Sequence, residues 1–412
     1  MHTFTLIFLA ALALAAALKL WLGLRHIRHV RANREAVPAE FADDITPDAH
    51  RKAADYSNAK TRLTLAGIAF EAAVVLALTF GGVLQFLHAT STGWFEPGVA
   101  RGVALMMLLG ALMAVIEIPF DIYRTFVIEQ RFGFNKMTPR MFIVDGLKHA
   151  LLAAALGIPL AACILWVMDG MGEAWWIYAW LVWVAFNLAV LAIFPTWIAP
   201  LFNKFSPLED LQLKARIERL LDRCGFKVGG LMVMDGSRRS SHGNAYFTGF
   251  GKTKRIVFFD TLLARLSPQE VEAVLAHELG HFKLKHVIKR MAWTFAASLA
   301  FLWLLAQLMT QAWFYSGLGV QSPSTAMALV LFFIVVPQFT FLLSPLTSYY
   351  SRKHEFEADR YATGHAAAAD LVTALVKLYK DNAATLTPDP LHSLFYDSHP
   401  PATARIARLK IS

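Results

Sequence analysis

Seven apolar segments, each long enough to cross a lipid bilayer, constrain the fold more than any other feature of the sequence. A membrane-spanning helix needs about 20 mainly apolar residues. The chain is 56% hydrophobic and only 17% charged, and its apolar residues are concentrated in these segments. The sequence therefore predicts a mainly α-helical integral membrane protein. We place its spans near Phe4–Leu24, Thr64–Leu87, Gly102–Phe120, Ala150–Met168, Trp175–Phe194, Met291–Ala306 and Ala326–Ser344.

The first span differs from a cleaved signal peptide in the position of its basic residues. Small residues such as Ala11 and Ala13 would suit a cleavage site. A signal peptide, however, carries its basic residues before the apolar stretch, and here they follow it. We therefore expect a retained helix with an external N-terminus, followed by Arg25, Arg28, Arg31 and Arg34.

Lysine and arginine alternate between rich and poor loops along the whole chain. The loops 25–63, 121–149 and 195–290 hold eight, five and sixteen of them, and the tail after Ser344 holds eight. The loops between them hold one or none. The positive-inside rule then places the rich loops and the C-terminus in the cytoplasm. The net charge of +9 therefore indicates membrane topology, and no nucleic acid partner is expected.

Two polar regions are large enough to form domains, and both are expected on the cytoplasmic side. Because they share that side, they can build one site together. We divide the chain into a membrane region with five spans and two cytoplasmic loops (1–194), a catalytic loop (195–290), spans six and seven (291–344) and a C-terminal cytoplasmic segment (345–412).

The segment His277-Glu278-Leu279-Gly280-His281 matches the H-E-x-x-H pattern of zinc peptidases. Upstream, Ser267 and Glu270 form a capping box that predicts the start of a helix. On that helix His277 and His281 lie one turn apart, so both imidazoles can reach one zinc ion. Glu278 is then placed to take a proton from a metal-bound water.

A third zinc ligand is expected from the C-terminal segment, because catalytic zinc usually has three protein ligands and an open position. Glu355 and Asp359 share one helical face. Glu355 is the predicted ligand, and Asp359 the predicted support of a ligand histidine. Glu357 points about 200° away and suits the role less. His354 and His365 remain alternative ligands, and the site is expected to hold one zinc ion per chain.

Further along, Ser398-His399-Pro400-Pro401 precedes Arg405. A histidine and an arginine near a peptidase zinc can stabilise the oxyanion of the tetrahedral intermediate. The alternative is that His399 belongs to a structural turn.

The residues before the zinc helix alternate as in a β-hairpin. Asn244–Phe250 and Arg255–Asp260 are the predicted strands, with a turn at 251–254. A hairpin beside a zinc helix could hold an extended peptide. It could equally be structural.

Several blocks of residues together resemble the type I CaaX prenyl protease family of integral-membrane zinc peptidases. The likeness runs from about Glu117 to Arg405 and includes HELGH, the Glu355–Asp359 pair and the SHPP segment. Its further markers are Phe126–Glu129, Gly133–Asn135, Ile198–Phe202, Lys204–Phe205, Asp235–Phe247, Lys254–Val257 and Phe259–Leu262.

The resemblance implies a fold and a role for individual residues. Seven helices would surround a water-filled chamber, with the zinc site at its cytoplasmic end. The matching residues are His277, His281 and Glu355 for the zinc ligands, Glu278 for the catalytic carboxylate, Asn244, Ala245, Tyr246 and Phe247 for the strand that pairs with substrate, and His399 and Arg405 near the scissile carbonyl.

The chain departs from the family pattern at two points. Gly243 stands where a serine is expected. The sequence also ends soon after Arg405, without the basic endoplasmic-reticulum retrieval tail of eukaryotic members. We therefore expect residence in a bacterial inner membrane, where prenylated substrates are not expected.

The expected function is hydrolysis of peptide bonds in peptide or protein substrates at the lipid bilayer. One alternative keeps this chemistry in a quality-control protease that degrades unprenylated membrane proteins. The other alternative is a channel or transporter with a structural metal. Glu278 argues against that alternative, because a structural site needs no carboxylate beside its ligands and is closed by a fourth one.

The topology can be tested with reporter fusions. A reporter fused after Ser412 should lie in the cytoplasm, and one inserted in the loop 312–325 should lie outside, because basic residues favour the cytoplasmic side. The reverse pattern would contradict the orientation.

Overall fold

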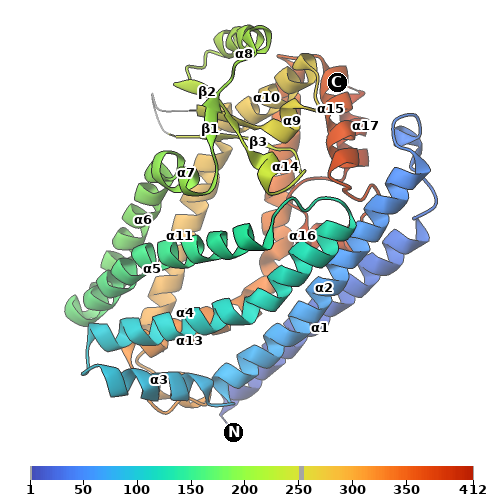
Figure 1. The fold of residues 1–412 in the computed structure, drawn as a ribbon. Helices are drawn as coiled ribbons and strands as arrows, with labels where there is room; N and C mark the ends of the chain where they lie inside the picture. Colours follow the sequence, from blue (N-terminus) through green and yellow to red (C-terminus); the bar gives the residue numbers. More distant parts are fainter. Residues whose placement is uncertain (1, 250–254, 412) are drawn as a thin grey trace.

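The computed structural model describes residues 2–249 and 255–411. Within them, seven helices are long and apolar enough to cross a membrane, which confirms the expected number of spans. The N-terminus lies at one end of the molecule, and the β-sheet and the C-terminus lie at the other (Figure 1). The spans contain α1 (Thr3–Ala32), α2 (Pro47–Thr79), α4 (Val99–Ile122), α5 (Pro139–Gly170), α6 (Trp175–Ile193), α11 (His286–Leu308) and α13 (Thr325–Thr340).

The second span begins and ends earlier than predicted. Helix α2 starts at Pro47, where the Thr46 hydroxyl accepts a hydrogen bond from the first turn. It ends at Thr79, and Gly82 then takes a φ of 76° before α3 (Val83–Trp94) begins. That left-handed conformation is open to glycine and strained for other residues. A hydropathy pattern cannot register this break, because apolar residues continue on both sides of it.

Helix α13 is the central helix of the membrane region. Over half (56%) of its most apolar 18-residue stretch is buried inside the protein. In the other spans the buried share of the corresponding stretch is 28% or less. Met327 and Leu331 of α13 are fully buried in a core that also contains Phe8 and Leu105 of surrounding helices. The outer spans therefore present mainly apolar surface outward, as a bilayer requires.

The sheet contains β1 (Phe205–Pro207), β2 (Gly230–Met234), β3 (Ala245–Thr248) and β4 (Arg255–Phe259), in the order β1-β2-β4-β3. Strands β3 and β4 are antiparallel, so the predicted hairpin strands are confirmed with small changes at their ends. The predicted turn at 251–254 lies outside the described residues. Among the described strands, β3 pairs only with β4 and is an edge of the sheet.

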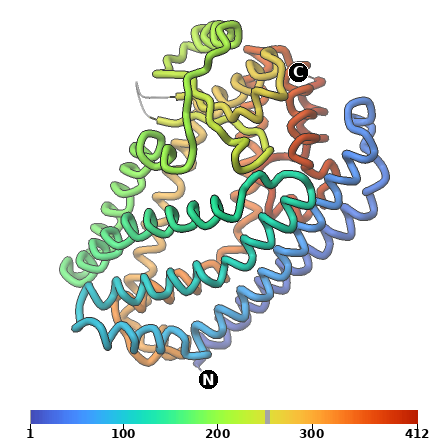
Figure 2. Tube along the Cα trace, viewed as in Figure 1, coloured from blue at the N-terminus to red at the C-terminus, as the bar shows by residue number. Residues whose placement is uncertain are grey.

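The helix that carries the H-E-x-x-H motif, α10 (Pro268–Lys283), starts with the predicted capping box of Ser267 and Glu270. Its buried face packs against α14 and α15, so the catalytic loop and the C-terminal segment form one body (Figure 2). The other helices are α7 (Ala199–Phe202), α8 (Leu211–Arg223), α9 (Asp260–Leu263), α12 (Ala312–Ser316), α14 (Ser344–Thr363), α15 (Ala368–Asp381), α16 (Pro390–Tyr396) and α17 (Ala402–Leu409).

Candidate active site

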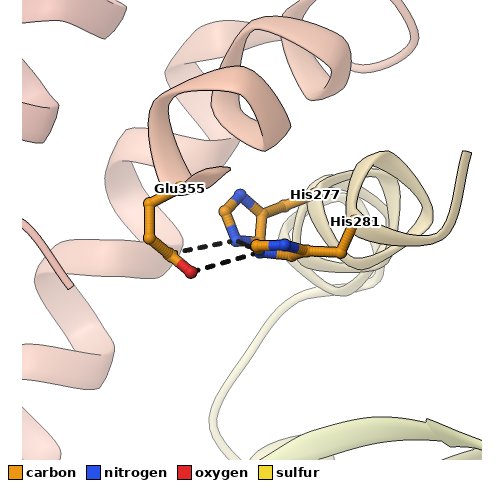
Figure 3. Close-up of side chains that lie close together, drawn as sticks. All are labelled: His277, His281 and Glu355. Carbon is orange, nitrogen blue, oxygen red and sulfur yellow. Dashed lines mark hydrogen bonds and ion pairs between the residues drawn. The ribbon is translucent and has the colours of Figure 1, made fainter. Parts of the chain in front are cut away.

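Three side chains from two helices converge on one point (Figure 3). The Nε2 atoms of His277 and His281, both on α10, lie 3.2 Å apart. The Glu355 carboxylate, on α14, lies 3.5 Å from the first of these atoms and 3.2 Å from the second. The structure thus brings the two motif histidines and the expected third ligand together.

This arrangement fits a divalent metal ion. Tetrahedral ligands about 2.0–2.1 Å from zinc are separated from one another by about 3.3 Å, which is close to the three observed distances. Glu355 is buried, and its Oε2 atom accepts no hydrogen bond from any described residue. The His277 Nε2 and Arg405 Nη1 atoms lie 3.5 and 3.6 Å from this oxygen, and a buried carboxylate oxygen without a hydrogen bond is costly unless a cation satisfies it. Two imidazoles and one carboxylate also form a donor set typical of catalytic zinc.

Asp359 contacts the Nδ1 side of the His277 ring, opposite Nε2, and Arg405 holds Asp359 there. The Nδ1 atom of His277 lies 2.8 Å from Asp359 Oδ1, as expected when Nε2 is the ligand atom. Arg405 donates to the same carboxylate from Nε at 2.9 Å and from Nη2 at 2.5 Å. Burial acts to lower the pKa of His277, but hydrogen bonds to Asp359 and Glu355 outweigh it and raise this pKa to about 9. The site therefore favours positive charge next to its carboxylates.

A cavity of about 400 Å³ is lined by two of the three converging side chains, His277 and Glu355. Glu278 is half-buried and lines it. A carboxylate in this position can reach a water bound at the same point. The further predicted site residues that line the cavity are Asn244, Ala245, His399 and Arg405.

His399 and Arg405 are placed differently, although both line the cavity. The His399 side chain is 63% exposed, and its Nε2 atom lies 3.5 Å from Glu355. Arg405 is buried, and two of its three guanidinium nitrogens are held by Asp359. Its third nitrogen, Nη1, lies 3.6 Å from Glu355. His399 is therefore open to an incoming peptide, whereas Arg405 mainly holds Asp359 in place.

The register of β3 decides which of its amides face outward. The Asn244 carbonyl accepts a hydrogen bond from the Phe259 amide at 3.0 Å. Because hydrogen-bonded pairs alternate along an antiparallel ladder, the Tyr246 amide also points to β4, while the Ala245 and Phe247 amides point to the open edge. The Ala245 amide donates to the Asn244 side chain at 2.8 Å.

The side chains of Tyr246 and Phe247 have apolar neighbours. The Tyr246 ring lies edge-on to Phe259, with ring centroids 6.2 Å apart. The Phe247 ring lies 6.2 Å from that of Phe282. These two residues therefore support the strand, whereas Ala245 and the preceding Asn244 line the cavity.

A hydrogen-bonded group that the sequence did not reveal holds the loop before β3. His242 lies 3.3 Å from Glu129, which ends a π-helical turn after α4, and 3.1 Å from Asn382 after α15. The Asn382 side chain also accepts the Gly243 amide at 3.3 Å. Glu129 and His242 lie in blocks that carry the family resemblance, but no spacing rule connects residues more than 100 positions apart.

A second residue that sequence reasoning missed is His286. Its Nδ1 atom lies 3.0 Å from His281 Nδ1, on the side away from the cavity. Its position five residues after His281, beyond the end of the helix, matches no ligand pattern.

The fold and the site together define a membrane-embedded metallopeptidase. Two family models cover nearly the whole chain: "CAAX prenyl protease N-terminal, five membrane helices" matches residues 26–204, and "Peptidase family M48" matches residues 207–411. The chain belongs to the type I CaaX prenyl proteases of peptidase family M48, and it is a protease. Both predictions made from the sequence are thereby confirmed.

Individual relatives support this assignment. The chain is similar to CAAX prenyl protease 1 of Saccharomyces cerevisiae, with 33% identity over 94% of this chain and 91% of the relative. The mouse homolog is 32% identical over 93% and 90% of the two chains. The Arabidopsis thaliana homolog is 40% identical over 71% and 69%. The crystal structure of S. mikatae Ste24p matches with a TM-score of 0.92 at 30% identity, covering 99% of both chains.

The close approach of α10 to α14 depends on Gly280. This residue lies on α10 just before His281 and faces Ala358 of α14. A Cβ atom on Gly280 would lie 3.0 Å from the Ala358 Cα and 3.1 Å from the Ala358 carbonyl oxygen. Both atoms belong to the backbone, so they can move only if α14 moves. Glu355 lies one turn earlier on α14 and would move with it.

We therefore expect Gly280→Ala to weaken metal binding and to lower the melting temperature. In a helix interior, alanine stabilises the folded protein by about 1 kcal/mol relative to glycine. Forcing extra atoms into a packed contact typically destabilises it by about 1–3 kcal/mol. Because the new methyl group would meet backbone atoms of Ala358, the destabilisation should exceed the gain in helix propensity. Gly157→Ala is the matched control, since nothing lies within 4 Å of its Cβ position. Metal content and melting temperature in detergent are the measurements, and two unchanged values for Gly280→Ala would contradict this account.

Proposed function

We propose that the protein is a zinc metalloendopeptidase whose metal is held by His277, His281 and Glu355. The convergence of these three side chains beside Glu278, in a cavity bordered by an open strand edge, is the observation that supports it best. Zinc supplies Lewis acidity there and lowers the pKa of a bound water toward 7. One ion per chain is enough for this chemistry.

Glu278 acts as the proton carrier of the reaction. It takes a proton from the attacking water and later gives it to the leaving amine. Asp359 keeps the Nδ1 proton on His277, so that Nε2 faces the metal. Arg405 holds Asp359 in position. His399, exposed and 3.5 Å from Glu355, is placed to donate to the oxyanion of the scissile carbonyl.

The substrate peptide pairs with β3 as an added strand. An open strand edge offers main-chain donors and acceptors that bind an extended peptide without regard to its side chains. The Ala245 amide supplies one such donor when the peptide carbonyl replaces Asn244 Oδ1 as its acceptor. A second cavity of about 470 Å³ shares Tyr379, Ala384 and His399 with the first and reaches α1 and α2. The bound peptide can thus extend toward the membrane helices and the hydrated chamber that the family resemblance implies.

The substrate class follows from the relatives, whose names describe CAAX prenyl proteases. We propose cleavage near the C-terminus of lipid-modified proteins. The alternative is quality control of unprenylated membrane proteins, which main-chain pairing with β3 would equally permit. Cleavage of prenylated against unprenylated versions of one peptide separates the two. The channel or transporter alternative has lost its basis, because the family is one of proteases.

The zinc site is proposed to face the cytoplasm, because the basic loops lie at its end of the molecule. The relatives named above come from a yeast, a plant and a mammal.

Two substitutions separate metal binding from proton transfer. His277→Ala should lose zinc and activity together, because one of three ligands is removed. Glu278→Gln should keep zinc and lose activity by about 10²–10⁴-fold, the usual contribution of a general base. Zinc content and kcat are measured for both variants. Glu218→Gln, on the exposed face of α8, is the control for a glutamate substitution. Near-normal turnover by Glu278→Gln would disprove its role.

Two proline variants test substrate pairing. Ala245→Pro removes an outward donor and should weaken peptide binding by about 0.5–1.5 kcal/mol, the net value of one ordinary hydrogen bond. Its zinc content and melting temperature should stay near those of the wild type. Tyr246→Pro removes a ladder hydrogen bond to β4 and should lower the melting temperature. If Ala245→Pro is folded and cleaves peptide with an unchanged KM, β3 does not hold the substrate.

A further inference from the structure

A buried histidine lies directly behind the proposed zinc ligand His281. His286 is 4% exposed, and its Nδ1 atom is 3.0 Å from His281 Nδ1. On its other side, His286 Nε2 lies 3.0 Å from the Glu357 carboxylate. The three residues form a continuous chain of hydrogen-bonding groups that leads away from the metal position.

A strained turn brings His286 into this place. Helix α10 ends at Lys283, and α11 begins at His286. Between them, Lys285 has a φ of 58°, in the left-handed region that non-glycine residues rarely occupy. Such a conformation is unfavourable for a lysine and persists where the surrounding structure requires it. The tight reversal places the first residue of α11 next to a side chain near the end of α10.

The hydrogen bonds determine where the protons lie once His281 binds a metal through Nε2. Its Nδ1 atom must then carry the proton, because a neutral imidazole has one N–H. That proton is donated to His286 Nδ1, which must be unprotonated. The proton of His286 therefore lies on Nε2 and is donated to Glu357.

We propose that His286 is a positioning residue that, supported by Glu357, holds the ring of His281 in the tautomer that binds the metal. The inference depends on the proposed role of His281 as a ligand. The two zinc histidines then have unlike supports. His277 contacts a carboxylate directly, whereas His281 contacts a neutral imidazole with a carboxylate behind it. A carboxylate therefore orients His277 directly, whereas it orients His281 only through the His286 ring.

The same residues do not favour a second metal ion. His286, His354 and Glu357 lie close enough to share one. However, the rings of His286 and His354 are stacked, with centroids 3.9 Å apart and planes at 8°. Nitrogen lone pairs lie in the ring plane, so two parallel rings cannot both point at one ion. Lys353 also lies 4.0 Å from Glu357 and partly neutralises it.

The experiment compares two substitutions of His286 in the full-length protein. His286→Leu removes the acceptor and should weaken zinc binding by about 10–100-fold, as for other residues that orient a ligand. In His286→Asn, the Oδ1 atom replaces Nδ1 as acceptor, so zinc affinity should return to near the wild-type value. Zinc affinity is measured by competition with a chelator. The absorption spectrum of the cobalt-substituted protein should change for His286→Leu and be restored by His286→Asn.

A third variant, His354→Phe, keeps the stacked ring and removes its nitrogen atoms. It should bind one zinc ion with wild-type affinity. Wild-type affinity in His286→Leu would overturn the proposal. Equal weakening in a folded His286→Asn would also overturn it. If the wild-type chain bound two zinc ions and His354→Phe bound only one, His286 would belong to a second metal site, and the proposal would be wrong. Retention of zinc by His281→Ala would instead disprove the proposed ligand set.

Discussion

The close contact of α10 with α14 is the constraint on which the rest of the site depends. Gly280 and Ala358 let the two backbones meet, and the three converging side chains lie within a turn of that contact. One helix supplies both imidazoles and the other the carboxylate. Neither segment can form the site alone, so the site exists only where these two parts of the chain pack into one body.

Buried charge holds this body together around α10. Arg216 and Arg223 of α8 both contact the buried Glu272, and Lys377 of α15 contacts Glu270 at 2.8 Å. Removing one partner of such a pair leaves an uncompensated charge, which costs more than the pair itself contributes. These contacts therefore link α10 to α8 and α15 through its buried carboxylates.

Local spacing made much of the molecule predictable. The seven spans, the capping box of α10, and the shared helical faces of His277 with His281 and of Glu355 with Asp359 all follow from periodicities of a few residues. The break at Gly82 was missed because it interrupts no apolar pattern. The contacts of His286 and of Glu129 with His242 depend on a strained turn and on distant packing. No rule of spacing encodes either one, so only the folded chain reveals them.

The helix that carries Glu355 follows the central span directly along the chain, with only a 3-10 turn at Phe341–Leu343 between them, and this has a geometric consequence. The candidate span Thr325–Thr363 has 39 residues, so its length is roughly 58 Å at 1.5 Å per residue. The apolar core of a bilayer is only about 30 Å thick. The C-terminal half of this segment must therefore project from the membrane and carries Glu355 with it. The distance between the lipid and the three converging side chains is thus set by the length of this segment.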